Sequence, residues 1–159
     1  MDAARRAGDD VAAAAVVCTE NWLLTGQARL DDAERMALAA AEAIEPSFAN
    51  SSRLHVGVWG WLNLGVAAAA VRNNRPDVAE DAMRRARAAA QVSAGVESPD
   101  IYHWAYFDSA VAAMRDVELA MVTGDAGKAL QHAAKRPAPC YLPAVPARPG
   151  RRSPGTPAI

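Results

Sequence analysis

Apolar residues recur along most of this sequence at intervals of three and four, the spacing of α-helices, and short polar turns separate the runs. The longest run, residues 54–71, is apolar on nearly every side, as in a helix that is covered on both flanks. After a turn at residues 73–77, a second segment carries one apolar stripe, formed by Ala79, Ala82, Met83, Ala86 and Ala90. We therefore predict a central antiparallel helical hairpin, around which the other elements pack.

Two further hairpins are predicted, one on each side of the central one. The first joins a helix that ends near Thr25, closed by Gly26, to a helix over residues 30–44. The inner face of that second helix is formed by Ala33, Ala37, Ala40 and Ile44. The third joins a helix capped by Asp108 or Ser109 to a last helix over residues 126–135, capped by Asp125. The apolar residues of these two helices are Val111, Met114, Val117, Met121 and Val122 in one, and the inward-facing Ala129, Leu130 and Ala133 in the other.

The length and composition favour one all-α domain. The chain has 159 residues, which is enough for a modest core, and it is rich in alanine with no alternating strand pattern. Seven of its ten prolines lie in residues 137–159, together with three arginines and no acidic residue. Such a segment buries too little apolar surface to order itself. We predict a helical domain over residues 1–136 and a disordered Pro/Arg-rich tail over residues 137–159.

The charge and cysteine content give no sign of nucleic acid, membrane or secretion. The net charge is −1, and neither cysteine, Cys18 nor Cys140, belongs to a disulfide framework. Glu80–Arg84 and Asp81–Arg85 are spaced as ion pairs along a helix, so the arginines there form a solvated face. No uninterrupted apolar run is long enough to span a membrane, and the first residues lack the pattern of a secretion signal. A cytoplasmic protein is expected.

The three hairpins also carry an internal repeat. Ala33, Ala37 and Ala40 are spaced by four and then three, the pattern of small residues in tetratricopeptide repeats, and Ala82, Ala86 and Ala89 repeat it. Trp61, Leu64 and Gly65 match the first-helix signature of that repeat, and residues 124–129 match its turn. The central hairpin is longer than the usual repeat of about 34 residues, and the third lacks the Trp-Leu-Gly element. We predict hairpins stacked as a tetratricopeptide-like right-handed solenoid.

Several segments point to a narrower family. They are Asn21-Trp22-Leu23-Leu24, Leu30-Asp31-Asp32-Ala33-Glu34-Arg35, Val58-Trp59-Gly60-Trp61-Leu62, Asn74-Arg75-Pro76-Asp77 and Thr123-Gly124-Asp125-Ala126-Gly127-Lys128-Ala129-Leu130. Together they resemble the C-terminal regulatory region of actinobacterial Cro/repressor-type helix-turn-helix transcriptional regulators, over residues 20–136. The resemblance implies a sensing domain that follows a DNA-binding headpiece. Because no headpiece precedes Glu20 and the tail replaces further helices, we expect a truncated or frame-disrupted relative, or a stand-alone remnant, that does not bind DNA tightly alone.

The sequence contains no motif that supports catalysis. Residues 124–129 lack the glycine spacing of a phosphate-binding loop and the Ser or Thr that should follow its lysine. The three histidines, His55, His103 and His132, are far apart, with no metal-binding spacing. No nucleophile and base are paired. We predict a protein that is not an enzyme, with no cofactor and no metal ion.

The aromatic residues supply the candidate groove for a ligand or partner. Its members are Trp59, Trp61, Tyr102, His103, Trp104 and Tyr106. The leading hypothesis is a non-catalytic regulatory module that binds a peptide or protein partner. One alternative is a small-molecule-binding domain with an enclosed cavity near Trp104. The other is a remnant without independent function that self-associates through an apolar stripe on its last hairpin. In all three, Trp61 is expected to be buried at the centre of the stack.

Overall fold

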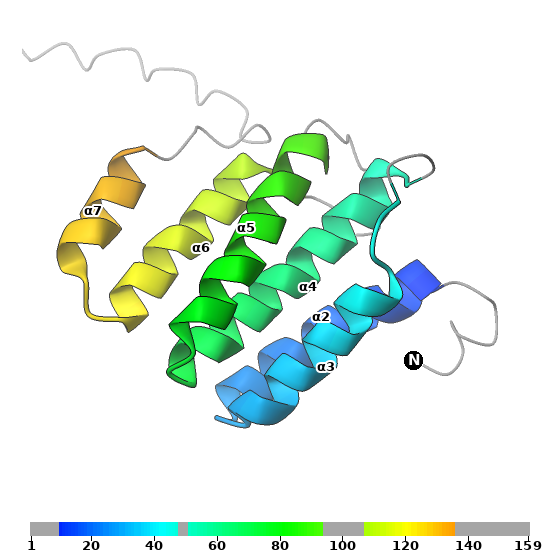
Figure 1. Cartoon of the computed structure of the whole chain (residues 1–159), viewed down its shortest axis with the longest axis horizontal. Helices are drawn as coiled ribbons and strands as arrows, with labels where there is room; N and C mark the ends of the chain where they lie inside the picture. Colours follow the sequence, from blue (N-terminus) through cyan, green and yellow to red (C-terminus); the bar gives the residue numbers. More distant parts are fainter. Residues whose placement is uncertain (1–9, 48–50, 94–106, 136–159) are drawn as a thin grey trace, which may run out of the picture.

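The computed structural model describes residues 10–47, 51–93 and 107–135, and within these ranges every regular element is an α-helix (Figure 1). The six helices are α2 (Asp10–Gly26), α3 (Leu30–Ala43), α4 (Arg53–Arg72), α5 (Pro76–Ser93), α6 (Ser109–Val122) and α7 (Ala126–Ala134). Short turns join them into three antiparallel hairpins, and the described ranges contain no strand. The all-α prediction is therefore confirmed. The tail over residues 137–159 lies outside the described ranges.

The same turn closes all three hairpins. The second residue after the end of each hairpin's first helix has a left-handed backbone, with φ of 59° at Ala28, 57° at Asn74 and 76° at Gly124. In each turn the next N–H bonds back to a helical carbonyl five residues earlier: Arg29 to Leu24, Arg75 to Ala70 and Asp125 to Ala120, each at 2.9 Å. This is the Schellman arrangement. Gly26 was predicted to close the first helix, but it is the last residue of α2, and Ala28 takes the left-handed position instead.

The helix starts follow the predicted capping residues. Pro76 is the first residue of α5, where its missing N–H costs nothing. Asp108 caps α6 by accepting the N–H of Val111 at 2.9 Å, and Asp125 caps α7 by accepting that of Lys128 at 2.8 Å. Each carboxylate satisfies an N–H group that has no partner within the helix. The short polar side chains at these positions therefore determine where α6 and α7 begin.

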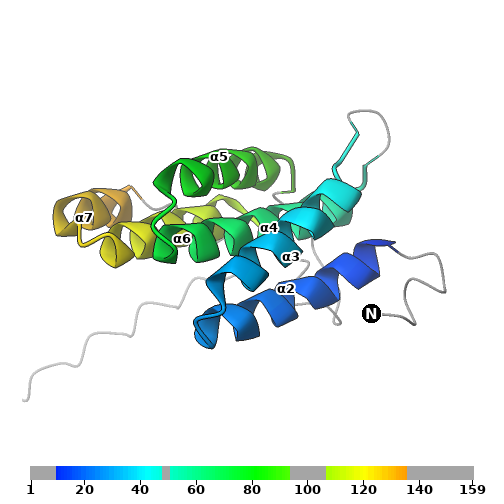
Figure 2. The ribbon, with the colours of Figure 1, turned by 60° about the horizontal axis from the view of Figure 1, so that its bottom comes forward.

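Helix α4 is the structural centre of the described chain. It packs against α2 and α3 of the first hairpin, against α5, and against α6 of the third hairpin. The hairpins follow one another across the molecule, so that α2 and α7 lie on opposite sides (Figures 1 and 2). By length and composition α4 is the one described helix that could cross a membrane, and 67% of its apolar 18-residue stretch is buried inside the protein. A helix buried to this extent packs as a core helix.

The tryptophans of α4 lie closer to the surface than predicted. Trp61 is half-buried rather than central, and its ring meets Phe107 edge to face with centroids 5.6 Å apart. Leu62 and Leu64 are the fully buried large side chains of this segment. Trp59, also half-buried, packs against both core clusters, one centred on the first hairpin and one on α4 and α5. A helix that is apolar all round does not reveal which of its sides meets solvent.

Two glycines allow α4 to approach its neighbours closely. A Cβ atom on Gly60 would lie 2.4 Å from the Phe107 ring, and one on Gly65 would lie 2.6 Å from Oδ1 of Asn21. Asn21 in turn donates from Nδ2 to the Ala33 carbonyl at 2.8 Å, which links α2 to α3 beneath α4. The absence of a side chain at Gly60 therefore permits the close approach of Phe107. Both contacts join α4 to a different hairpin, so these glycines set the distance between hairpins.

Candidate functional site

The structure does not show the predicted aromatic groove as a unit. Trp59 and Trp61 lie half-buried on α4 and take part in its packing. The other four members, Tyr102, His103, Trp104 and Tyr106, lie outside the described residues. The same holds for the enclosed cavity expected near Trp104. The candidate site is therefore sought where the described surface departs from the repeated packing of the hairpins.

The common turn aligns the hairpins residue by residue. Counted from the left-handed residue of each turn, Ala33, Ala79 and Ala129 are equivalent, and all three are buried. Ala33 thus corresponds to Ala79 and not to Ala82, so the two alanine triplets predicted as equivalent are offset by one helical turn of three residues. The same counting makes Leu64 of α4 equivalent to Met114 of α6. The second hairpin is followed by the third, whereas no described helix follows the third. Equivalent side chains of these two hairpins therefore show what a following hairpin covers.

The comparison reveals an open packing face on the third hairpin. Leu64 is 1% exposed and belongs to a core cluster that also contains Phe107 and Ala112 of the third hairpin. Its equivalent Met114 is 50% exposed. Asn21 and Ala67 are buried, whereas the equivalent Val117 is only half-buried. In the second helices, Ala37 and Met83 are buried, whereas the equivalent Ala133 is exposed. We call this surface the forward face; it consists of Met114, Val117, Met121, Val122 and Ala133.

The forward face is hollowed. A surface groove of about 720 Å³ is lined by Met114, Val117, Glu118, Met121, Val122 and Ala133. Met121 is 68% exposed, an unusual value for a long apolar side chain outside an interface. Leu130 was predicted to face inward but is 73% exposed, and of the three predicted inner residues of α7 only Ala129 is buried. The reason is that α7 packs on α6, and no further described helix covers its other side.

The single charged residue of the groove is neutralised by its neighbours. Oε1 of Glu118 accepts from Nη2 of Arg72 at 2.7 Å, and Oε2 pairs with Arg115. Burial lowers the pKa of the Arg115 guanidinium from its ordinary value, and Glu118 opposes that effect. Because this carboxylate is already shared by two guanidinium groups, the groove presents apolar side chains rather than an unpaired charge.

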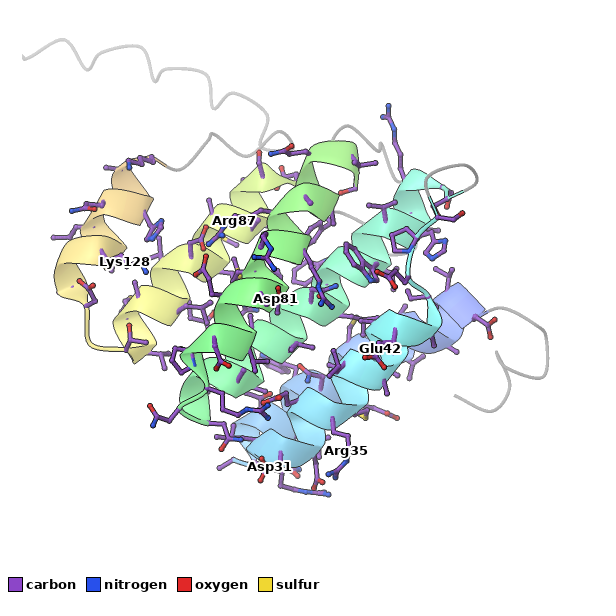
Figure 3. All side chains as sticks on the ribbon, viewed as in Figure 1. Asp31, Arg35, Glu42, Asp81, Arg87 and Lys128 are labelled. Carbon is purple, nitrogen blue, oxygen red and sulfur yellow. The ribbon has the colours of Figure 1, made fainter. Side chains whose placement is uncertain are left out.

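The charged side chains gather on the second helices instead (Figure 3). Asp31, Arg35 and Glu42 lie along α3, Asp81 and Arg87 along α5, and Lys128 on α7. The charged residues of α3 and α5 supply at least one partner of most ion pairs of the described chain, and each pair lies on one element or joins two neighbouring ones. Exposed pairs of this kind contribute little stability individually.

The predicted ion pairs of α5 are partly wrong. Asp81–Arg85 forms at 2.8 Å, as expected. Arg84 pairs with Asp81 rather than with Glu80, and Glu80 lies 3.4 Å from Arg87. Arg87 also donates to Asp116 of α6 at 2.6 Å, and the hydrogen bond to Asp116 raises the pKa of its guanidinium. The arginines of α5 are thus not merely solvated, because Arg87 joins the second hairpin to the third.

A second, polar groove of about 520 Å³ runs along α3 and reaches Arg75. Within it the Glu34 side chain is 6% exposed, with Oε1 at 2.5 Å from Nη1 of Arg75. Its Oε2 atom is buried and has no hydrogen-bond partner within the described residues. The Arg75 pair links the first hairpin to the second and explains the burial of this carboxylate.

Cys18 and His55 are two described side chains of types that carry chemistry in other proteins, and both are engaged in hydrogen bonds to backbone carbonyls. Burial raises the pKa of the Cys18 thiol to about 12, which makes it a poor nucleophile. Nε2 of His55 lies 2.6 Å from the Ile44 carbonyl, so this ring is used to close the end of α3. Within residues 10–47, 51–93 and 107–135, no three His, Cys, Asp or Glu side chains are placed to hold a metal ion. The forward face therefore offers apolar side chains for packing.

Comparison of the chain with protein-family models, with curated proteins and with solved structures gives no match in any of the three.

Proposed function

We propose that this chain is a non-catalytic, tetratricopeptide-like binding module that takes a helical segment of a protein partner on its forward face. The observation that carries the proposal is the contrast between Leu64, buried, and its equivalent Met114, half-exposed. In the first two hairpins this position receives the next helix of the stack. A groove lined by methionine and valine is suited to the apolar stripe of an amphipathic helix.

The pattern of helix contacts supports the tetratricopeptide-like part of the proposal. Each hairpin's first helix packs on the first helix of the preceding hairpin, α4 on α2 and α6 on α4. It also packs on the preceding second helix, α4 on α3 and α6 on α5. Each pair of neighbouring hairpins thus repeats the same contacts, which is the arrangement expected of a solenoid.

The role proposed for the module is regulatory, as the resemblance to the sensing half of transcriptional regulators suggests. The partner is a peptide or protein, and a cytoplasmic setting is proposed with it. Because the described arginines are engaged by carboxylates, as Arg72, Arg75 and Arg87 illustrate, no free basic face is offered to nucleic acid by these residues. We accordingly propose that this chain alone does not bind DNA tightly.

A selection experiment tests the proposal. A displayed library of amphipathic helical peptides is selected against the full chain, and enriched peptides are measured by fluorescence anisotropy. We expect binders with one apolar stripe whose affinity falls by at least about tenfold with Met121→Glu, because a charge is placed in an apolar contact. Val92→Glu is the matched control: Val92 is an exposed apolar residue of α5 that does not line the groove of the forward face, and its substitution should change nothing. Peptides that bind wild type and Met121→Glu equally would refute the proposal.

A further inference from the structure

The opposite end of the stack carries a second exposed apolar surface. Val16, Trp22 and Leu23 of α2 are all exposed, and Trp22 is 70% exposed. Counted from the turns, Val16 is equivalent to Leu62 of α4 and Ala112 of α6, and Leu23 is equivalent to Ala69 and Leu119. We call Val16, Trp22 and Leu23 the backward face, because their equivalents face the preceding hairpin.

The equivalents of the backward face are covered in the later hairpins. Leu62 is buried in the cluster that contains Ala14, Val17 and Ala41 of the first hairpin. Ala112 is buried, and Leu119 half-buried, in the cluster that contains Ala82, Met83 and Ala86 of the second hairpin. Each position thus contacts the hairpin before it. On α2 the same positions are exposed because no described helix precedes it.

A specific contact shows that the two open faces match. Between the second and third hairpins, Arg72 of α4 pairs with Glu118 of α6 at 2.7 Å. The position equivalent to Arg72 on the forward face is Val122, and the position equivalent to Glu118 on the backward face is Trp22. Where this interface joins a cation to an anion, both ends of the stack carry an exposed apolar residue. At the other internal interface, between the first and second hairpins, the equivalent positions are Gly26 and Ala68, which also form no ion pair. The polar pair is replaced on both sides at once, as complementarity between the two ends requires.

We infer that the forward face docks a second copy of this chain, with α2 of one copy lying on α6 and α7 of another. The inference rests on the proposed function of the forward face and names its partner. The two faces belong to opposite sides of the molecule (Figures 1 and 2), so the contact is head to tail and each copy keeps one face open. Such contacts do not close after two copies and build longer chains as the concentration rises.

Sedimentation velocity of the full 159-residue chain over a range of concentrations tests the inference. The average mass is expected to rise with concentration from the 16.7 kDa of one chain and to pass beyond that of a dimer. Trp22→Glu removes the backward face and Met121→Glu the forward face, so each variant alone should sediment as a monomer. An equimolar mixture of the two should form dimers and nothing larger, because one intact pair of faces remains. Val92→Glu should associate like wild type.

Three results would overturn the inference. One is a wild-type chain that stays monomeric up to about millimolar concentration, because any contact between copies would then have a dissociation constant above about 1 mM. Another is a mixture of the two variants that remains monomeric while wild type associates, because the intact forward face of one variant would then not bind the intact backward face of the other. The third is association of either variant alone. Since selected helical peptides can still bind the forward face in each case, failure of the inference is distinguishable from failure of the proposed function.

Discussion

The left-handed residues of the three turns show how one backbone need is met by different side chains. Gly124 takes this conformation at no steric cost and Asn74 at a small one, but Ala28 places a Cβ against the next carbonyl. The hydrogen bond from Arg29 to Leu24 keeps Ala28 there. The turn is thus determined by the two helices it joins, and the residue in it adds a local strain.

Ala28→Gly is expected to stabilise the protein, because it relieves that strain at an exposed position where little packing is lost. We expect the free energy of unfolding to rise by about 0.5–1 kcal/mol. Relief of the left-handed strain raises it, and the greater conformational entropy of glycine in the unfolded chain offsets part of that gain. Urea unfolding followed by circular dichroism measures it. The control is Ala39→Gly in the exposed middle of α3, which should lose about 1 kcal/mol. A loss at both positions would contradict this explanation.

Cys18 is expected to make the folded protein less stable as the pH rises above about 9. Its thiol has a pKa of about 12 in the folded chain, against an ordinary value of 9.0, because burial disfavours the thiolate. A raised folded-state pKa contributes stability that is complete below the unfolded value and is lost as the pH rises from 9 towards 12. Compared with Cys18→Ala, wild type should lose about 1 kcal/mol more by pH 10. Parallel unfolding curves of the two proteins from pH 7 to 10 would show that the thiol is not buried as described.

At the scale of the helices, the distance between hairpins depends on small residues at crossing points. Gly60 is the clearest example, since Phe107 occupies the space where a Cβ would lie. The ring belongs to the residue just before the cap of α6, so the contact places the start of the third hairpin against α4. Helix propensity alone would favour alanine at this position, and the packing overrides it.

Gly60→Ala is therefore expected to destabilise the protein by about 1–2 kcal/mol in urea unfolding, the cost of overpacking less the gain in helix propensity. Gly127→Ala in α7 is the matched control, because the nearest atom to its added Cβ lies at 3.6 Å. That change should be neutral or stabilising by up to about 1 kcal/mol. If both substitutions behave alike, the close approach of Phe107 to α4 is wrong.

Helix boundaries could be predicted from the sequence because they depend on local chemistry. Asp108, Asp125 and Pro76 act within a few residues of themselves, and the structure places them where capping requires. Burial could not be predicted as well, because apolar periodicity shows which face is apolar and not whether another helix covers it. Leu130 and Met121 have helical spacing like that of buried residues, yet both are exposed.

For the same reason the sequence indicates the candidate site in only one of its three hypotheses, the one with an apolar stripe on the last hairpin. The leading hypothesis places the groove at the aromatic residues, and the sequence alone gives Met114, Val117 and Met121 only as the apolar face of a helix. The signal that could have located it is a comparison between hairpins: α6 carries methionine and valine where α2 carries Cys18 and Asn21. Large flexible side chains at positions that elsewhere hold small or polar ones indicate a contact of a different kind.

At the scale of the whole molecule, self-association and stability are linked. If folded copies bind one another and unfolded ones do not, each tenfold rise in concentration above the dissociation constant stabilises the folded state by about 1.4 kcal/mol. The thermal midpoint of wild type should then rise by about 3–6 °C per tenfold increase in concentration, given the entropy of unfolding of a domain of this size. Trp22→Glu and Met121→Glu cannot associate alone, so their midpoints should not change with concentration. An equimolar mixture of the two should regain part of the dependence, because their intact faces still match.

Differential scanning calorimetry over a hundredfold range of concentration measures all four samples. A midpoint that rises equally in wild type and in both variants would place the association elsewhere on the surface, and a constant midpoint in wild type would mean that the folded copies do not bind one another at these concentrations.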